Sequence, residues 1–229
     1  MTRLLIVDNS IHADLYDPVT HWTRSTDAAS VVCRPPRGEG AASLDGVTHV
    51  LVTGSEASIN GDDPWILSTC ELVRDIAARG LPVLGSCFGH QLVVRALSGR
   101  EFVRASPTPE FGWVEVTRTP AGDRDPVASR LPSPFFAFSA HFDEVWPLPA
   151  DWDSLARSAR CDHAIVKWRN GPVWGVQHHP EISVDEGVHL IDGEMRVMPD
   201  KCETILAAYQ REPRDSLVTR ALLAAFLAL

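Results

Sequence analysis

The sequence predicts an α/β fold in which a central, mostly parallel β-sheet carries helices on both faces and is extended by antiparallel strands. Two observations lead to this expectation. In the first half, short apolar runs alternate with patterns of helical period, which is typical of a parallel sheet covered on both faces. In the second half, strand-like runs follow one another between Pro- and Gly-rich turns, which indicates an antiparallel or mixed extension.

The expected parallel strands are short apolar runs that end in turn residues or breakers. They lie at residues 4–7, 31–33, 49–52 and 82–84. A helix is expected to begin at Pro64, because proline is favourable in a first helical turn, and to end before Gly80. A second helix is expected over residues 91–97, ending at Gly99. The order strand, helix, strand, helix is that of a parallel sheet.

The second half is expected to add the strands of a mixed or antiparallel extension and two further helices. The strand-like runs are residues 114–117, 135–138, 155–158, 165–168 and 173–177. Helices are expected at residues 205–209 and 217–229. The last of these is almost wholly apolar, so we expect it to dock on the domain, with a partner interface as the alternative.

Length and charge limit the possible classes of function. The chain has 229 residues and shows neither an internal repeat nor a convincing linker, so residues 1–229 are expected to form a single domain. Its 21 Lys and Arg against 30 Asp and Glu give a net charge of −9, which argues against nucleic acid and anionic membrane surfaces as partners. The longest apolar stretch, residues 221–229, is far shorter than the roughly 20 residues of a membrane span.

Cysteine usage and the absence of nucleotide motifs narrow the chemistry. Five cysteines with no CxxC pair argue against a disulfide framework or a zinc site and favour a reducing cytoplasm. There is no Gly-rich phosphate loop of either common kind. We therefore expect no cofactor and no metal.

The turn Gly-Ser-Cys-Phe-Gly at residues 85–89 is the most informative segment. A predicted strand runs directly into a predicted helix, and Cys87 lies at the turn between two glycines. This is the arrangement of a nucleophile elbow. The small flanking residues allow a sharp turn that projects the middle side chain from the sheet. At a helix N-terminus the thiolate form is favoured. The backbone N–H of Phe88 would point to the same side, where it could bind an oxyanion.

A thiolate nucleophile needs a base, and the strongest candidates follow the apolar run 173–177. His178 and His179 emerge there at the expected carboxyl edge of the sheet, where sites form in open α/β folds. Only one of them can face Cys87, because neighbouring residues of an extended chain point in opposite directions. Glu181, two residues after His179, could accept the other ring N–H and fix the tautomer.

These two motifs together resemble the class I (triad) glutamine amidotransferase family. The matching residues are Gly85, Cys87, Gly89 and Gln91 in the first motif, and Gly175, Val176, Gln177, His179, Pro180 and Glu181 in the second. The spacing resembles the GMP-synthase-like branch, which includes stand-alone chains. The resemblance implies a flavodoxin-like three-layer sandwich and a triad of Cys87, His179 and Glu181. His178 stands where the family usually has an aromatic residue, so it is assigned to packing or to the wall of the site.

The resemblance implies further site residues. Gly54 and Ser55 resemble the family's Gly-Gly loop, of which one backbone N–H is the second oxyanion donor. Ser55 replaces the second glycine, so the oxyanion hole is not necessarily preformed. His141 lies in a segment similar to the family's His-Gly-Asp segment beside the glutamine pocket, and Gln91 is expected near the bound glutamine.

The expected activity is hydrolysis of the γ-amide of glutamine through a γ-glutamyl thioester on Cys87. The resemblance implies that the ammonia goes to a separate synthetase subunit or another acceptor, since the chain has no nucleotide motif of its own. A stand-alone γ-glutamyl peptidase or hydrolase acting on another γ-glutamyl compound is the alternative. A catalytically silent binding module on the same scaffold is a third possibility.

Overall fold

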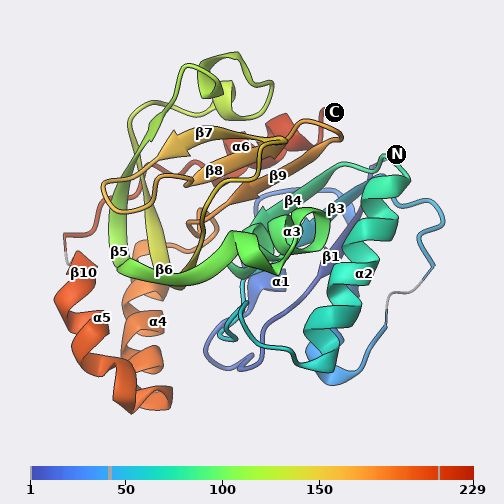
Figure 1. The fold of residues 1–229 in the computed structure, drawn as a ribbon. Coiled ribbons are helices and arrows are strands. Elements are labelled where there is room, and N and C mark those ends of the chain that lie inside the picture. Colours follow the sequence, from blue (N-terminus) through green and yellow to red (C-terminus); the bar gives the residue numbers. More distant parts are fainter. Residues whose placement is uncertain (1, 41–42, 211) are drawn as a thin grey trace.

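The computed structural model describes residues 2–40, 43–210 and 212–229. Five parallel strands form one side of the sheet in the order β2-β1-β3-β4-β9, with β2 at the edge (Figure 1). They are β1 (Arg3–Val7), β2 (Ala29–Cys33), β3 (His49–Val52), β4 (Val83–Ser86) and β9 (Val173–Val176). The predicted mostly parallel sheet is confirmed, and all five strands lie where apolar runs predicted them.

Antiparallel strands extend the sheet beyond β9. First come β8 (Ile165–Trp168) and β7 (Trp152–Arg157), and β7 in turn pairs with the end of β5 (Val103–Arg118). The rest of β5 pairs antiparallel with β6 (Phe135–Val145) and parallel with the short β10 (Tyr209–Gln210). The antiparallel extension is therefore confirmed, but β5 and β6 are much longer than the predicted runs 114–117 and 135–138.

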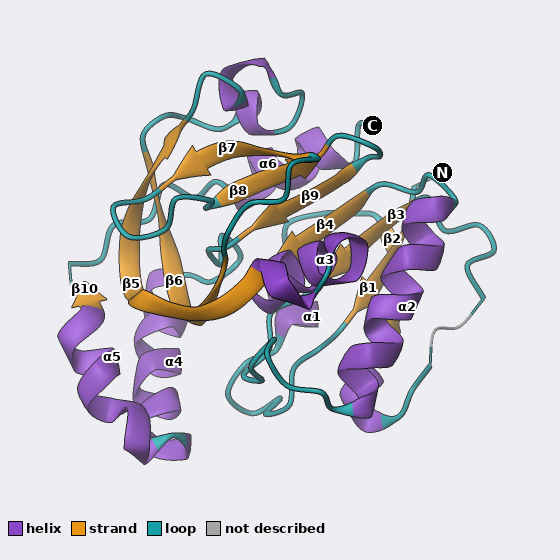
Figure 2. Ribbon diagram, in the orientation of Figure 1, coloured by secondary structure: helices purple, strands orange, loops and turns teal. Residues whose placement is uncertain are grey.

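Helices cover both faces of the parallel strands (Figure 2). One face carries α2 (Pro64–Ala78) and α3 (Phe88–Ser98), and the other carries α1 (Pro18–Thr23) and α6 (Thr219–Phe226). Alternate residues of β1 pack on opposite faces of the sheet. Leu5 packs with α2 and α3, and Leu4 packs with α1 and α6. Because successive strand residues point to opposite faces, a continuous apolar strand is buried on both sides.

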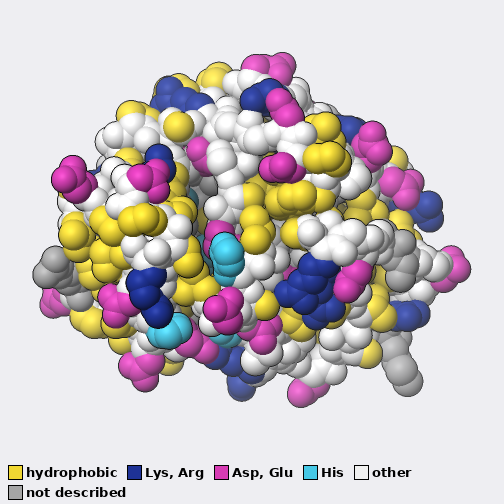
Figure 3. Space-filling model, turned by 90° about the horizontal axis from the view of Figure 1, so that it is seen from below, with side chains coloured by type: hydrophobic (Ala, Val, Ile, Leu, Met, Phe, Trp, Pro, Cys, Tyr) yellow, Lys and Arg dark blue, Asp and Glu magenta, His cyan; other side chains and the backbone are white. Residues whose placement is uncertain are grey.

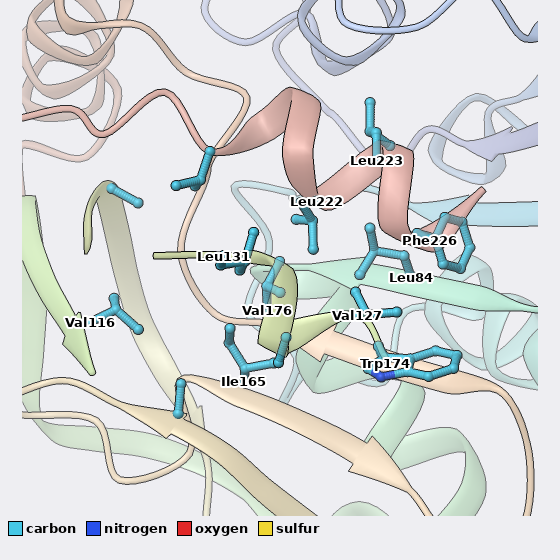
Figure 4. Packing of buried hydrophobic residues seen from close by; sticks show 14 of the residues in the cluster. Leu84, Val116, Val127, Leu131, Ile165, Trp174, Val176, Leu222, Leu223 and Phe226 are labelled. Carbon is cyan, nitrogen blue, oxygen red and sulfur yellow. The ribbon is translucent and has the colours of Figure 1, made fainter. Parts of the chain in front are cut away.

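The apolar C-terminal segment docks on the domain. Leu222, Leu223 and Phe226 of α6 are almost completely buried against the sheet, near Leu84 of β4 and Trp174 of β9 (Figure 4). This confirms the docking that the apolar composition predicted. The helix itself is shorter than the expected 217–229.

Two helices after the parallel strands pack against β5 and β6. They are α4 (Val184–Val197) and α5 (Cys202–Ala208), and their residues Leu190 and Ile205 share a third apolar cluster with Phe111 and Phe138. A capping box of Ser183 and Glu186 begins α4. Helix α5 matches the expected 205–209 in part, whereas α1 and α4 were not predicted from the sequence. The short 3₁₀ turns are η1 (Pro35–Arg37), η2 (Arg100–Phe102), η3 (Gly122–Arg124), η4 (Ala128–Arg130) and η5 (Pro199–Lys201).

One face of the molecule carries mixed charge. On the face seen from below, acidic and basic side chains are interspersed with hydrophobic ones (Figure 3). A membrane-crossing helix, which needs length and a continuous apolar composition, is not found in the part of the chain that the structure describes.

Candidate active site

Cys87 occupies a strained turn between β4 and α3. Its φ of 49° and ψ of −107° lie where a side chain is rarely accommodated, and such outliers concentrate at functional sites. The flanking glycines allow the backbone of this turn to pack closely on itself and on β3. A Cβ on Gly85 would lie 2.3 Å from the carbonyl oxygen of Gly89, and a Cβ on Gly89 would lie 2.1 Å from the carbonyl oxygen of Val52. The turn has the geometry expected of a nucleophile elbow.

The register of β4 and β9 brings the second motif to Cys87. The two strands pair in parallel with Ser86 opposite Val176, and the N–H of Cys87 donates to the carbonyl of Val176 at 2.8 Å. Cys87 and His179 therefore follow neighbouring strands at the same edge of the sheet, where both side chains are buried and the charge of Cys87 acts on the pKa of His179. The Nδ1 atom of His179 lies 2.8 Å from Oε1 of Glu181. The structure thus brings the three predicted triad residues together.

Tyr16 is a fourth member of this cluster, and no sequence pattern pointed to it. Its hydroxyl donates to Oε1 of Glu181 at 2.7 Å and lies 3.4 Å from Nδ1 of His179. The side chain is buried in the loop after β1, and its ring meets the imidazole of His179 edge-on. Because it holds the same carboxylate oxygen as His179, Tyr16 fixes the position of Glu181.

The buried cluster favours a charged imidazole. Burial alone would lower the pKa of His179, but the charges of Cys87 and Glu181, together with the hydrogen bond to Glu181, raise it well above its usual 6.5. Burial raises the pKa of Glu181, yet the charge of His179 and hydrogen bonds from His179 and Tyr16 outweigh it and lower the pKa. Imidazolium and carboxylate therefore stabilise each other inside the protein.

His178 has a different environment from that of His179. Its ring packs edge-on against Phe135, with the ring centroids 5.3 Å apart, and neither ring nitrogen has a hydrogen-bond partner within the described residues. Burial lowers its pKa to about 4. The side chain is neutral at ordinary pH and lies in a packed position.

The segments expected to supply oxyanion donors lie beside the cluster. A Cβ on Gly54 would lie only 2.6 Å from Cε1 of His179, so the backbone of this loop is close to the imidazole. Ser55 and Phe88 line the same cavity as Cys87. Phe88 is the first residue of α3, where a backbone N–H has no intrahelical acceptor. Ser55 is not among the described residues with positive φ, so the serine side chain imposes no left-handed strain there.

A cavity of about 290 Å³ opens next to Cys87. This volume is close to the lower end of small-molecule sites, which span roughly 300–1,000 Å³. Its wall includes Cys87, both predicted substrate-binding residues Gln91 and His141, and residues that follow α4. A small substrate fits such a space.

Gln91 and His141 are both in the cavity wall, and both are engaged by protein groups. Gln91 Nε2 donates to the carbonyl of Asp143 at 2.7 Å and to Oε1 of Gln177 at 3.1 Å. The ring of His141 lies 2.9 Å from the carbonyl of Asp143 and 3.3 Å from a carboxylate oxygen of Glu110. These contacts brace strand β6 against the site.

Several residues of the site were not identified from the sequence. The amide of Gln177 lies 3.7 Å from Sγ of Cys87, and Glu194 and Lys201 line the cavity from the segment after the triad. Gln177 stood within the second motif, which was the available signal. Tyr16, Glu194 and Lys201 belong to no local pattern, and the contact between Tyr16 and Glu181 spans 165 positions.

The chain is similar to proteins of known family. The sequence pattern of the family described as glutamine amidotransferase class-I matches residues 42–195. A relative from Methanospirillum hungatei, named as one subunit of glutamine-hydrolyzing GMP synthase, is 34% identical over 57% of this chain and 66% of its own length. A protein of the same name from Methanothermobacter thermautotrophicus is 32% identical over 58% of this chain and 69% of its own length. The first of these relatives is thus covered over slightly less than two thirds of its length.

A solved structure shares the fold over nearly the whole chain. It is described as a glutamine amidotransferase from Thermotoga maritima, with a TM-score of 0.77 and 21% identity over 99% of this chain and 96% of that protein. The predicted flavodoxin-like α/β fold is confirmed by this likeness. The match of the family pattern over residues 42–195 and the identity to the curated relatives show that the chain belongs to the class I glutamine amidotransferase family.

Proposed function

We propose that this protein hydrolyses the γ-amide of glutamine through a γ-glutamyl thioester on Cys87. The proposal rests on one observation. Cys87, His179 and Glu181 lie together at the carboxyl ends of β4 and β9, beside a cavity of small-molecule size. The cluster has a nucleophile, a base that follows the neighbouring strand, and a carboxylate that orients the base.

The first half of the reaction forms the thioester. His179 takes the proton of the Cys87 thiol and becomes an imidazolium. The sulfur then attacks the amide carbon of glutamine, and the carbonyl oxygen becomes an oxyanion. Backbone N–H groups of Phe88 and of the Gly54–Ser55 loop bind that oxyanion. When the C–N bond breaks, His179 gives its proton to the departing nitrogen, and ammonia leaves.

The second half releases glutamate. His179, now neutral, takes a proton from a water molecule, whose oxygen attacks the thioester carbon. The C–S bond then breaks, and the sulfur of Cys87 leaves as thiolate, which is again paired with the imidazolium. Glu181, held by Tyr16, keeps the imidazole oriented and stabilises its charged form.

We further propose that the ammonia passes to a separate synthetase subunit. The similarity to proteins named as one subunit of a glutamine-hydrolyzing GMP synthase supports a division of this kind. The reducing cytoplasm is the compartment that we propose, since all five cysteines, Cys87 among them, are free thiols.

Replacing each of the two neighbouring histidines by Asn tests the proposal. Ammonia release from glutamine and labelling of Cys87 by an electrophilic diazoketone analogue of glutamine would be measured. Loss of the general acid–base lowers turnover by about a hundredfold to ten-thousandfold in His179→Asn. The matched control His178→Asn is expected to stay close to wild type, because that ring packs against Phe135.

Three outcomes would contradict this assignment. Loss of turnover in His178→Asn with an active, folded His179→Asn would reverse the identity of the base. Turnover of γ-glutamyl peptides and none of glutamine would indicate a stand-alone γ-glutamyl hydrolase instead. If the wild-type chain shows no turnover and no labelling of Cys87, the protein would be a catalytically silent binding module.

A further inference from the structure

Three acidic side chains line the cavity beside Cys87, and they differ in their partners. Glu56 accepts hydrogen bonds from the backbone N–H groups of Ile11 at 2.9 Å and His12 at 3.4 Å. The carboxylate of Asp143 accepts from the side chains of Ser58 and Asn60 and from the N–H of Ile59 at 2.6–3.1 Å. Protein donors thus hold two of the three acids.

Glu194 is the third acid, and protein donors do not satisfy it. It lies in the last turn of α4, lines the cavity, and is only 7% exposed. Its Oε2 atom is buried without a hydrogen-bond partner anywhere in the described ranges 2–40, 43–210 and 212–229. A buried carboxylate oxygen without a donor is costly, and Glu194 is the acid of the cavity wall that a ligand in the cavity could supply with a donor.

The proposed substrate carries a donor of the required charge. At the end remote from the γ-amide, glutamine has an α-ammonium group beside an α-carboxylate. An ammonium is a donor without any acceptor capacity, and its hydrogen bond to a carboxylate is charge-assisted. Lys201, on η5 in the same cavity wall, supplies a positive charge, so the wall presents both charges that a zwitterionic amino acid requires.

We propose that Glu194 binds the α-ammonium group of the γ-glutamyl substrate and selects for substrates whose α-amino group is free. This inference rests on the proposed function. It adds to it the residue that recognises the α-ammonium group, at the end of the substrate remote from the γ-amide. It also assigns a role to the segment after the triad, because α4 carries Glu194 into the cavity.

The test compares two substrates in wild type and in Glu194→Gln. Glutamine is one, and glutaric acid monoamide, which is glutamine without its α-amino group, is the other. The variant is expected to raise KM for glutamine by about ten- to a hundredfold, with a smaller change in kcat, because a hydrogen bond between two charged groups is lost. For the monoamide, wild type and variant are expected to have the same KM. Glu203→Gln is the matched control, since Glu203 is exposed on α5 outside the cavity wall.

The wild-type protein provides a second measurement that does not depend on how the variant folds. Burial raises the pKa of Glu194 to about 7, with the charge of His179 opposing the rise and that of Glu56 adding to it. The other charged or titratable groups that line the cavity are Glu56, Cys87, His141, Asp143 and Lys201, and of the groups outside that lining His179 also acts on the pKa of Glu194. Because the ionised form binds an ammonium, KM for glutamine should fall between about pH 6 and pH 8, and KM for the monoamide should not share that fall.

The outcomes separate this inference from the proposed function. Equal losses on both substrates in Glu194→Gln, or a KM for glutamine that changes with pH only as KM for the monoamide does, would overturn the role of Glu194 while the glutaminase activity stands. A wild-type chain that neither releases ammonia from glutamine nor labels at Cys87 would overturn the proposed function, and the inference with it.

Discussion

At the scale of single residues, the candidate site depends on a carboxylate shared by two donors. Oε1 of Glu181 lies 2.7 Å from the hydroxyl of Tyr16 and 2.8 Å from Nδ1 of His179. All three side chains are buried, so their hydrogen bonds are stronger than they would be in water. Burial and the charge of Glu181 also raise the pKa of Tyr16 well above 10, which keeps its hydroxyl a donor.

Removing this hydroxyl tests its positioning role. In Tyr16→Phe we expect kcat/KM for glutamine to fall about tenfold, the lower end for a hydrogen bond to a charged group. The acidic limb of the pH profile should also move to higher pH, since the hydrogen bond from Tyr16 lowers the pKa of Glu181. The measurement is the rate of ammonia release across pH. A profile superimposable on that of wild type would mean that Tyr16 only fills space.

The residues found from the sequence are those that local patterns mark. Cys87 stood between two glycines at a strand-to-helix turn, and His179 and Glu181 followed an apolar strand. The choice of His179 over its neighbour came from the family resemblance, and residue chemistry alone left it open. Tyr16 and Glu194 reach the site from segments without a marking pattern, so only the folded chain reveals them.

At the scale of secondary-structure elements, the site exists because β4 and β9 are neighbours although the chain between them is long. Strand-like runs predicted both elements, and the rule that parallel strands end at one edge predicted where their following residues go. The lengths of β5 and β6 were not predictable in the same way. Their ladder shifts register between Ala105 and Glu110, and such an irregularity breaks the alternation from which a strand is recognised.

Substituting an elbow glycine tests how closely α3 must approach β3. In Gly89→Ala the new methyl group would lie 2.1 Å from the carbonyl oxygen of Val52, so backbone must move and Cys87 with it. We expect labelling of Cys87 to fall at least about tenfold and the free energy of unfolding to fall by about 1–3 kcal/mol, as in overpacked cores.

The matched control for that variant is Gly40→Ala. No atom lies within 4 Å of the position that a Cβ would take at Gly40, so this variant should label at the wild-type rate and unfold at the wild-type denaturant concentration. Normal labelling in Gly89→Ala would show that the elbow tolerates a wider turn than its contacts indicate.

At the scale of the whole molecule, the site lies where several parts of the chain converge. The loop after β1 contributes Tyr16, β4 and β9 contribute the elbow and the histidine, and α4 closes one side of the cavity. Composition and periodicity predicted the sheet and its helical cover, because those depend on local apolar patterns. The packing of α4 and α5 on β5 and β6 depends on a separate apolar cluster of distant residues, which no local window contains.

Because the buried ion pair belongs to the fold as well as to the site, it should link stability to pH. The raised pKa of His179 contributes stability that is fully present below its ordinary value of 6.5 and is lost as pH rises through the raised value. The lowered pKa of Glu181 contributes stability that is present above 4.5 and is lost as pH falls through the lowered value. Both contributions are therefore present together between pH 4.5 and 6.5.

Glu181→Gln removes the charge and keeps the shape, so it tests this linkage. We expect it to lower the free energy of unfolding by about 1.5–3 kcal/mol within that window, the range for a hydrogen bond to a charged group. The difference from wild type should shrink as pH rises through the pKa of His179, because the imidazolium that the carboxylate stabilises is then lost. Denaturant unfolding at a series of pH values measures it, with the exposed Glu71→Gln on α2 as the control. A pH-independent difference between Glu181→Gln and wild type would mean that the carboxylate stabilises the fold through packing and neutral hydrogen bonds rather than through the charge on His179.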